Sequence, residues 1–323
     1  MINISSSKIK KSALNTIDLE AQAIAGLTNF INDDFVACIQ LIFNSKGRVI
    51  VTGIGKSALI GEKIVATFNS TGTPAIFMHA ADAVHGDLGI VQKDDVILCI
   101  SKSGATPEIK LLIPYLKLSG NTIIAMVGNL DSYLAKQADY FIETTVSQEA
   151  CPNNLAPTSS TTAQLVMGDA MAVALLELRG FSPKDFALYH PGGALGKKLF
   201  LRVSDIYVNN EKPMVEIDAD ITSAIVEISS KRLGATAVLN KGKLVGVITD
   251  GDLRRMIQSG KPFETLNAVD IMTKNPRTIS PKILVAQALD IMRSNNITQL
   301  PVVDGDNYLG VIHLHDILKE GIL

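Results

Sequence analysis

The feature that most constrains the fold is a regular alternation of short apolar runs and helical patterns between residues 49 and 143. Helical patterns near residues 57–69, 107–119 and 131–138 lie between the apolar runs. The runs expected to form strands are Val49–Thr52, Ala75–Met78, Val96–Ile100, Thr122–Val127 and Tyr140–Glu143. Apolar strands that alternate with helices are typical of a doubly wound parallel sheet. The sequence therefore predicts an α/β domain with five parallel strands.

Helical spacing also marks both sides of this region. The stretch up to about residue 43 is predicted to form one or two helices, because Ile17, Ala21 and Ile24 recur at helical spacing. A second apolar stripe follows the same spacing from Ala163 to Leu178, and Gly180 is expected to end that helix.

The C-terminal part of the chain contains an internal repeat. Ala224 matches Ala288 (288 − 224 = 64), and the Gly-Val-Ile sequence at residues 246–248 returns at residues 310–312. Two such units are expected to pack together, because each alone leaves an apolar face exposed. With a linker at Leu201–Asp205, the predicted domains are residues 1–203, 204–262 and 263–323.

Composition excludes several classes of protein. Lys and Arg number 30 against 32 Asp and Glu, and this net charge of −2 gives no reason to expect nucleic acid as a partner. The best membrane-span candidate, Thr162–Leu176, is short and contains Gln164 and Asp169. No N-terminal signal peptide is visible, so we expect a cytoplasmic protein with no membrane partner.

A glycine-rich loop follows the first strand, with the sequence Gly53-Ile54-Gly55-Lys56-Ser57-Ala58. It fits the dinucleotide pattern G-x-G-x-x-A, but the next strand ends in Phe-Met-His with no acid for a ribose hydroxyl. It also fits the end of a P-loop, but that motif needs a glycine where Ile50 stands. Both interpretations, and a plain strand-to-helix turn, stay open from the residues alone.

The loop after the third strand indicates an anion site more specifically. Its residues 101–108 read Ser-Lys-Ser-Gly-Ala-Thr-Pro-Glu. Pro107 suits the first position of a helix, which makes Thr106 the N-cap residue. Free backbone N–H groups and three hydroxyls, from Ser101, Ser103 and Thr106, form a socket for a phosphate dianion. The loop lies at the carboxyl end of a parallel strand, where α/β domains bind ligands.

Together these loops resemble the sugar-isomerase (SIS) domain, whose fold is flavodoxin-like, and the repeat resembles a pair of CBS units. With residues 85–89 (His-Gly-Asp-Leu-Gly) and 190–196 (His-Pro-Gly-Gly-Ala-Leu-Gly), the whole is similar to the D-arabinose-5-phosphate isomerase family. The resemblance implies reversible aldose–ketose isomerisation of D-ribulose 5-phosphate and D-arabinose 5-phosphate through an enediol. The product supplies 3-deoxy-D-manno-octulosonate (Kdo) for lipopolysaccharide.

The resemblance implies four catalytic residues, namely Lys56, Glu108, Glu149 and His190. Glu149 follows the fifth strand and is the first choice for the base, and Glu108 is the second choice or its proton partner. A glutamate base needs a pKa raised from about 4.3 toward 6–7 by partial desolvation. From the residues alone, Glu108 equally fits the first turn of a helix dipole, Glu149 a solvated loop and Lys56 an exposed helix start.

The predicted substrate-binding residues are Gly53, Gly55, Ser57, Gly72, Thr73, His79, His85, Ser101, Ser103 and Thr106. The isomerisation requires no cofactor, but His79 matches a position where the family can bind a divalent ion such as zinc. One histidine makes a poor metal site without further ligands.

The tail is predicted to regulate or to assemble the enzyme. Thr249 and Asp252 match a Thr/Asp pair that holds ribose in CBS units, whereas the second repeat has His313 and Asp316. The resemblance implies a nucleotide or a nucleotide sugar at the CBS pair or in the SIS pocket, and a homotetramer. The alternative is a non-catalytic sensor with an SIS pocket and a CBS tail; a nicotinamide-dependent oxidoreductase rests only on the glycine pattern.

Overall fold

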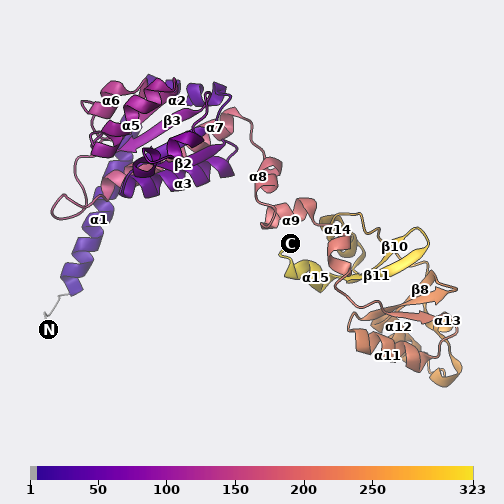
Figure 1. Cartoon of the computed structure of the whole chain (residues 1–323). Helices are drawn as coiled ribbons and strands as arrows, with labels where there is room; N and C mark the ends of the chain where they lie inside the picture. Colours follow the sequence, from indigo (N-terminus) through magenta and orange to yellow (C-terminus); the bar gives the residue numbers. More distant parts are fainter. Residues whose placement is uncertain (1–5, 323) are drawn as a thin grey trace. The chain divides into compact units, whose positions relative to one another are not determined.

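The structure, a computed structural model, describes residues 6–322. The chain divides into two compact units, with the boundary between Phe186 and Ala187. Each unit has its own core, and each is described by itself (Figure 1).

The first unit is built on a five-stranded parallel sheet. Its strands are β1 (Val49–Gly53), β2 (Ala75–His79), β3 (Val96–Ser101), β4 (Thr122–Val127) and β5 (Tyr140–Glu143), in the order β2-β1-β3-β4-β5. All neighbouring pairs are parallel. The predicted fold is confirmed, and each observed strand ends within one residue of its predicted end.

Helices cover both faces of this sheet (Figure 1). One face packs on α2 (Asp33–Asn44), α3 (Lys56–Ser70) and α7 (Ser159–Leu178). The other face packs on α4 (Ala80–Ala83), α5 (Pro107–Leu118) and α6 (Tyr133–Gln137). Burial of a strand such as β3 on both faces explains why its sequence is apolar up to its last residue, Ser101.

Helix α1 (Ser6–Gly26) and the short 3₁₀ helix η1 (Leu27–Phe30) precede α2 and contact α7 or β5. A second 3₁₀ turn, η2 (Asp87–Ile90), leads into β3. Within residues 6–322, α7 alone has the length and apolar content of a membrane span. Its side chains Ala163, Met167, Met171 and Leu175 are buried in the core of the unit, as expected of the central helix of an α/β domain.

The second unit contains the predicted repeat. Its first copy is α11 (Ile221–Lys231), β7 (Ala235–Asn240), β8 (Lys243–Thr249) and α12 (Asp250–Gln258); its second is α14 (Val285–Asn295), β10 (Gln299–Asp304), β11 (Asn307–His313) and α15 (Leu314–Lys319). A mixed sheet runs in the order β10-β11-β8-β7-β6, with β6 at Met214–Glu216 and β9 (Thr273–Lys274) paired to β8. The remaining elements are α8 (Pro183–Tyr189), which spans the unit boundary, α9 (Ala194–Phe200), α10 (Val203–Tyr207), η3 (Phe263–Thr265) and α13 (Ala268–Ile271).

The segment Leu201–Asp205 differs from the expected free linker. The Leu201 carbonyl accepts a hydrogen bond from the Val285 amide (2.9 Å), and Val203 is fully buried in the core of the second unit. This segment therefore belongs to the repeat unit rather than connecting to it.

Candidate functional site

The carboxyl ends of the parallel strands bring the predicted loops together. Gly53, the last residue of β1, lies beside His79 of β2 and Ile100 of β3. A Cβ on Gly53 would lie 3.1 Å from the Ile100 carbonyl oxygen, so the close approach of the strands favours glycine here. Gly55 has a φ of +60°, which favours glycine, and α3 begins at the exposed Lys56.

Ser57 lies in the first turn of α3 and donates its hydroxyl to Gln164 Oε1 of α7 (3.2 Å). The glycine loop is thereby tied to the helix that also supports the acid described below. Gln164 is buried and was not predicted as part of the site.

The loop of residues 101–106, named here the phosphate loop, requires glycine at position 104. Gly104 has a φ of +60°, and a Cβ there would lie 2.1 Å from Ser132 Oγ. The Gly104 amide donates to Ser101 Oγ (3.1 Å). Thr106 does stand at the N-cap position before Pro107, but its side chain makes no capping bond, and its buried Oγ1 has no partner. That hydroxyl is therefore free to meet a ligand.

Unpartnered buried polar atoms gather at this edge of the sheet. Of the six such side-chain atoms in residues 6–322, five belong to residues at a strand's carboxyl end, in the loop after it or on the first turn of α7. They belong to Thr52, His79, Thr106, Thr144 and Ser159. Because buried polar groups nearly always find a partner, this cluster indicates where a polar ligand binds.

Glu149 lies in a cage of hydrogen-bond donors. Its side chain is 0% exposed. Oε1 accepts from the Ser160 hydroxyl and from Lys102 Nζ, both at 2.5 Å. Oε2 accepts from the amides of Thr158 (2.8 Å) and Ser160 (3.1 Å) and from the Thr158 hydroxyl (3.2 Å). The carboxylate is therefore fixed by the phosphate loop on one side and by the start of α7 on the other.

This cage corrects two expectations about Glu149. The loop after the acid returns to it, so the amino terminus of α7 does face the carboxylate, and a solvated loop position is wrong. Burial acts to raise the pKa of Glu149, but the hydrogen bonds from Lys102, Ser160 and Thr158 outweigh it and lower that pKa to about 2. The raised pKa expected of a base is therefore not found.

Glu108 has a different environment. It is the second residue of α5, is half-buried, and makes no hydrogen bond or ion pair with other described residues. Glu108 lies two residues after the phosphate loop, in the first turn of α5, where a negative charge is favourable.

His79 ends β2 at the same edge, and its side chain is 35% exposed. Its Nδ1 lies 3.6 Å from Asp82 Oδ2 and lacks a hydrogen-bond partner. Residues 6–322 contain no group of three His, Cys, Asp or Glu side chains that could hold a metal ion. His79 and Asp82 therefore do not fit a resident zinc ion, which needs about four ligands. His85 follows α4 and is exposed.

Three predicted residues do not join this edge within the first unit. Gly72 and Thr73 lie between α3 and the start of β2, at the amino edge of the sheet. Gly72 has a φ of +89°, and a Cβ there would lie 2.7 Å from the Phe181 ring, which explains the glycine structurally. His190 belongs to the second unit, in the turn before α9, and its role stays a prediction.

Sequence reasoning missed Lys102, Thr158 and Ser160, although signals for them exist. Lys102 stands between two serines already assigned to phosphate. The run Thr158–Thr162 consists of five consecutive hydroxyl residues at the start of an apolar helix. Such a run can donate to an anion from both side chains and free backbone amides.

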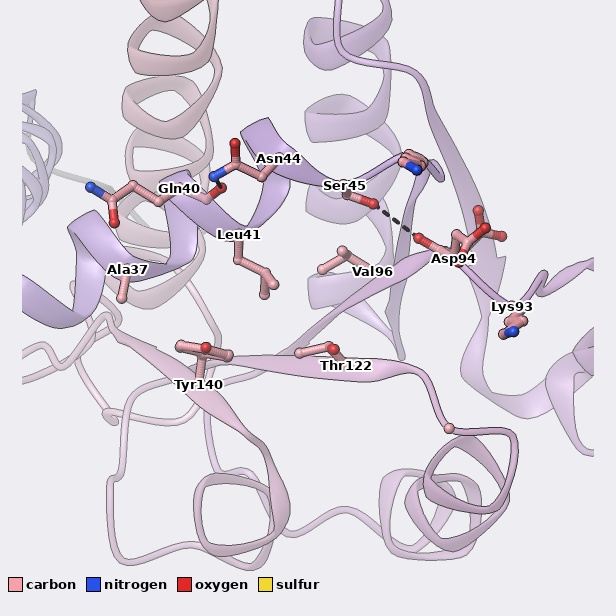
Figure 2. A pocket seen from close by; sticks show the side chains of 13 residues that line it. Ala37, Gln40, Leu41, Asn44, Ser45, Lys93, Asp94, Val96, Thr122 and Tyr140 are labelled. Carbon is pink, nitrogen blue, oxygen red and sulfur yellow. Dashed lines mark hydrogen bonds between the residues drawn. The ribbon is translucent and has the colours of Figure 1, made fainter.

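A cavity of about 660 Å³ lies at the opposite, amino edge of the sheet (Figure 2). Figure 2 shows α2 residues such as Gln40 and Asn44 above the starts of β4 and β5, at Thr122 and Tyr140. The Ser45 hydroxyl donates a hydrogen bond to the Asp94 carbonyl oxygen (2.9 Å). None of the predicted site residues lines this cavity, so its size alone does not make it the reaction site.

Comparison with known proteins identifies the family. Residues 41–174 match the SIS domain, and residues 203–259 and 268–322 match the CBS domain. The chain is 49% identical over 315 residues to the arabinose 5-phosphate isomerase KdsD of Pseudomonas aeruginosa, covering 97% of both chains. It is 46% identical to KdsD of Escherichia coli K12, over 97% of this chain and 96% of that protein. The chain belongs to the arabinose 5-phosphate isomerase family.

A solved structure is also similar to part of this member of the arabinose 5-phosphate isomerase family. The Escherichia coli CFT073 protein c3406, in complex with arabinose 5-phosphate, is 41% identical with a TM-score of 0.57. The match covers 58% of this chain and 100% of that chain. The SIS match contains the glycine loop, the phosphate loop and Glu149, whereas His190 lies between the SIS and CBS matches.

The CBS repeat of this family member contains a second cavity, of about 400 Å³. Thr249 and Asp252 line it, together with Arg255 and Arg277. Asp252 is already paired: it accepts from the Thr249 hydroxyl (2.6 Å), from the Thr273 hydroxyl (2.9 Å) and from Arg255. Burial opposes the charge of Asp252, but these bonds lower its pKa. Thr249 and Asp252 thus form the cap of α12 and line the cavity at the same time.

Proposed function

We propose that this protein catalyses the reversible isomerisation of D-ribulose 5-phosphate and D-arabinose 5-phosphate through an enediol. The observation that carries the proposal is the 49% identity over 97% of the chain to an enzyme named for this activity. The phosphate loop and two carboxylates at one sheet edge fit the chemistry, which needs an anion anchor and a base.

In this mechanism the substrate phosphate binds Ser101, Ser103, Thr106 and the free amides of the phosphate loop. The sugar then lies at the carboxyl edge, where the loops after β1 and β5 stand on opposite sides of the phosphate loop. Glu149 moves the proton between C1 and C2, with Glu108 as its proton partner. Lys56, exposed at the start of α3, offers a cation to the developing enediolate. His85 contacts the sugar, and His190 takes part in catalysis by handling the sugar ring.

The wider role is also part of the proposal. The product supplies Kdo for lipopolysaccharide, and the enzyme is a cytoplasmic homotetramer that requires no cofactor. Exposed apolar side chains on α1, at Ile9, Leu14 and Ile17, support an assembly of several copies. The CBS cavity, with its two arginines, takes a nucleotide or nucleotide sugar that regulates the enzyme.

The non-catalytic sensor is not favoured. Relatives that align along 97% of the chain are named as isomerases, and the net charge of −2 gives no reason to expect DNA as a partner. Glu108 is a free acid near the phosphate loop. A carboxylate there fits proton transfer better than it fits the binding of a phosphate, which carries the same sign of charge.

The test is direct. Purified full-length protein is incubated with ribulose 5-phosphate, arabinose 5-phosphate or ribose 5-phosphate, without nicotinamide. Interconversion of the first two is expected. Binding of these sugars without conversion would support the sensor instead.

A further inference from the structure

One lysine connects the phosphate loop to Glu149 at the carboxyl edge of the sheet. Lys102 lies between Ser101 and Ser103 in the phosphate loop, and its Nζ is 2.5 Å from Glu149 Oε1. The Lys102 side chain is 46% exposed, whereas that of Glu149 is 0% exposed. The loop that binds phosphate and the acid that moves the proton are therefore linked by a single exposed side chain.

The backbone of Lys102 is held in place by a hydrogen bond to the next strand end. The Lys102 carbonyl oxygen accepts from the Gly128 amide (3.1 Å) just after β4. A Cβ on Gly128 would lie 3.0 Å from that oxygen, so the two segments are in close contact. Motion at this position is left to the flexible four-carbon stem of the lysine.

The Glu149 carboxylate keeps its position without the lysine. Ser160 and Thr158 supply four other hydrogen bonds, one to Oε1 and three to Oε2. When the lysine leaves, Oε1 gains an unoccupied lone pair on the side of the phosphate loop. A free lone pair within hydrogen-bond reach of the substrate is what a general base needs.

A bound phosphate competes for the lysine. A phosphate monoester carries a charge of about −1.5 to −2 at neutral pH, against −1 for a carboxylate. The two residues beside Lys102, Ser101 and Ser103, are expected to donate to that phosphate. The phosphate thus carries more charge than the buried acid, and its expected donors stand on either side of Lys102 in the loop.

We propose that Lys102 is a positioning residue that holds Glu149 in the substrate-free enzyme and turns to the substrate phosphate on binding, which frees Glu149 Oε1 to act as base. This inference rests on the proposed function. It also accounts for a base whose oxygens are all occupied before substrate arrives.

The charged groups around Glu149 determine how its pKa should change when Lys102 is removed. From the start of α7 it is faced by the uncharged Ser160 and by Thr158 at the N-cap position. From its own loop it is faced by Asn154, whose amide oxygen accepts from the Glu149 backbone amide (2.7 Å). Among described residues, Lys102 supplies the charge that pairs with Glu149. Removing Lys102 therefore raises the pKa of Glu149 in the free enzyme but has no such effect in the substrate complex.

The experiment uses the full-length enzyme and three variants. Lys102→Met removes the charge and Lys102→Arg keeps it. Lys63→Met is the matched control, because Lys63 is also 46% exposed and pairs with Asp169 away from the loop. The pH profiles of kcat and kcat/KM and inhibition by inorganic phosphate are measured for each protein.

Lys102→Met should raise KM and the inhibition constant of inorganic phosphate about tenfold, as loss of one charge-assisted hydrogen bond predicts. The acid limb of kcat/KM, which reports the free enzyme, should move to higher pH, while that of kcat stays. Lys102→Arg should keep the KM, the phosphate inhibition constant and the acid limb of kcat/KM near their wild-type values. Lys63→Met should match the wild type in all three.

Two results would overturn the proposal. If both acid limbs move together, Lys102 stays on Glu149 throughout turnover. If phosphate inhibition is unchanged, Lys102 does not meet the phosphate. Should Lys102→Met fail to fold, Lys102→Gln, which keeps a neutral donor for Glu149, takes its place. An inactive wild type would contradict the proposed function instead, and calorimetric phosphate affinities of wild type and variant still test the lysine.

Discussion

Ser160 donates twice to the Glu149 carboxylate, from its hydroxyl at 2.5 Å and from its backbone amide at 3.1 Å. One residue at the start of α7 thus binds both oxygens of the acid. Because hydrogen bonds to a charged, buried group are the strong ones, this contact is central to the site.

Replacing Ser160 with alanine should destabilise the protein by about 1.5–3 kcal/mol, because a buried charged acceptor loses one partner. Chemical denaturation followed by circular dichroism measures the change. The neighbouring Ser159→Ala is a matched control, since Ser159 is equally buried but its Oγ has no partner. Equal effects of the two substitutions would contradict the role given to Ser160.

Glu149→Gln should destabilise the protein in a pH-dependent way. The pKa of Glu149 is lowered from 4.5 to about 2 in the folded state, so the ionised form is stabilised by folding. That contribution is fully present above about pH 4.5 and is lost as the pH falls toward 2. The difference in unfolding free energy between wild type and variant should therefore shrink over this window.

The same denaturation series checks this from pH 7 to pH 3. Glu62→Gln, an exposed acid on α3, is the control and should show no such trend. A wild-type advantage that stays constant with pH would mean that folding does not favour the ionised carboxylate.

Ser103→Ala should raise KM about tenfold or more, because one donor to the phosphate is lost at a cost of about 1.5–3 kcal/mol. Steady-state kinetics with arabinose 5-phosphate measures it. Ser119→Ala, just after the other end of α5, should leave KM unchanged. An unchanged KM in Ser103→Ala would show that the Ser103 side chain does not bind the phosphate.

Much of the fold was predictable from local patterns. The five strands are mainly apolar, so their positions follow from the sequence to within one residue. The repeat was visible because Ala224 and Ala288 occupy equivalent positions in α11 and α14. Gly53, Ser101 and Thr106 were predicted at one sheet edge because parallel strands place their carboxyl ends together.

The rest depends on contacts between distant segments. The environment of Glu149 is set by Thr158 and Ser160, which return to it through an irregular loop without helical or strand periodicity. Because these residues fold back onto Glu149, its pKa is lowered, whereas a raised pKa is expected of a base. Gly72 and Thr73 were assigned by resemblance, and only the topology shows that they lie at the other edge. Leu201–Asp205 was mistaken for a linker because its hydrogen bonds reach residues about 80 positions later, which no local pattern reveals.

The most direct test of the central claim is proton exchange at C2 of arabinose 5-phosphate in D₂O, followed by NMR. The wild-type enzyme should incorporate deuterium, and Glu149→Gln should lose this exchange by about 100- to 10,000-fold, since a general base is removed. Glu108→Gln should slow exchange less, as the substitution of a proton partner. Exchange that survives in Glu149→Gln and disappears in Glu108→Gln would contradict the assignment of Glu149 as the base.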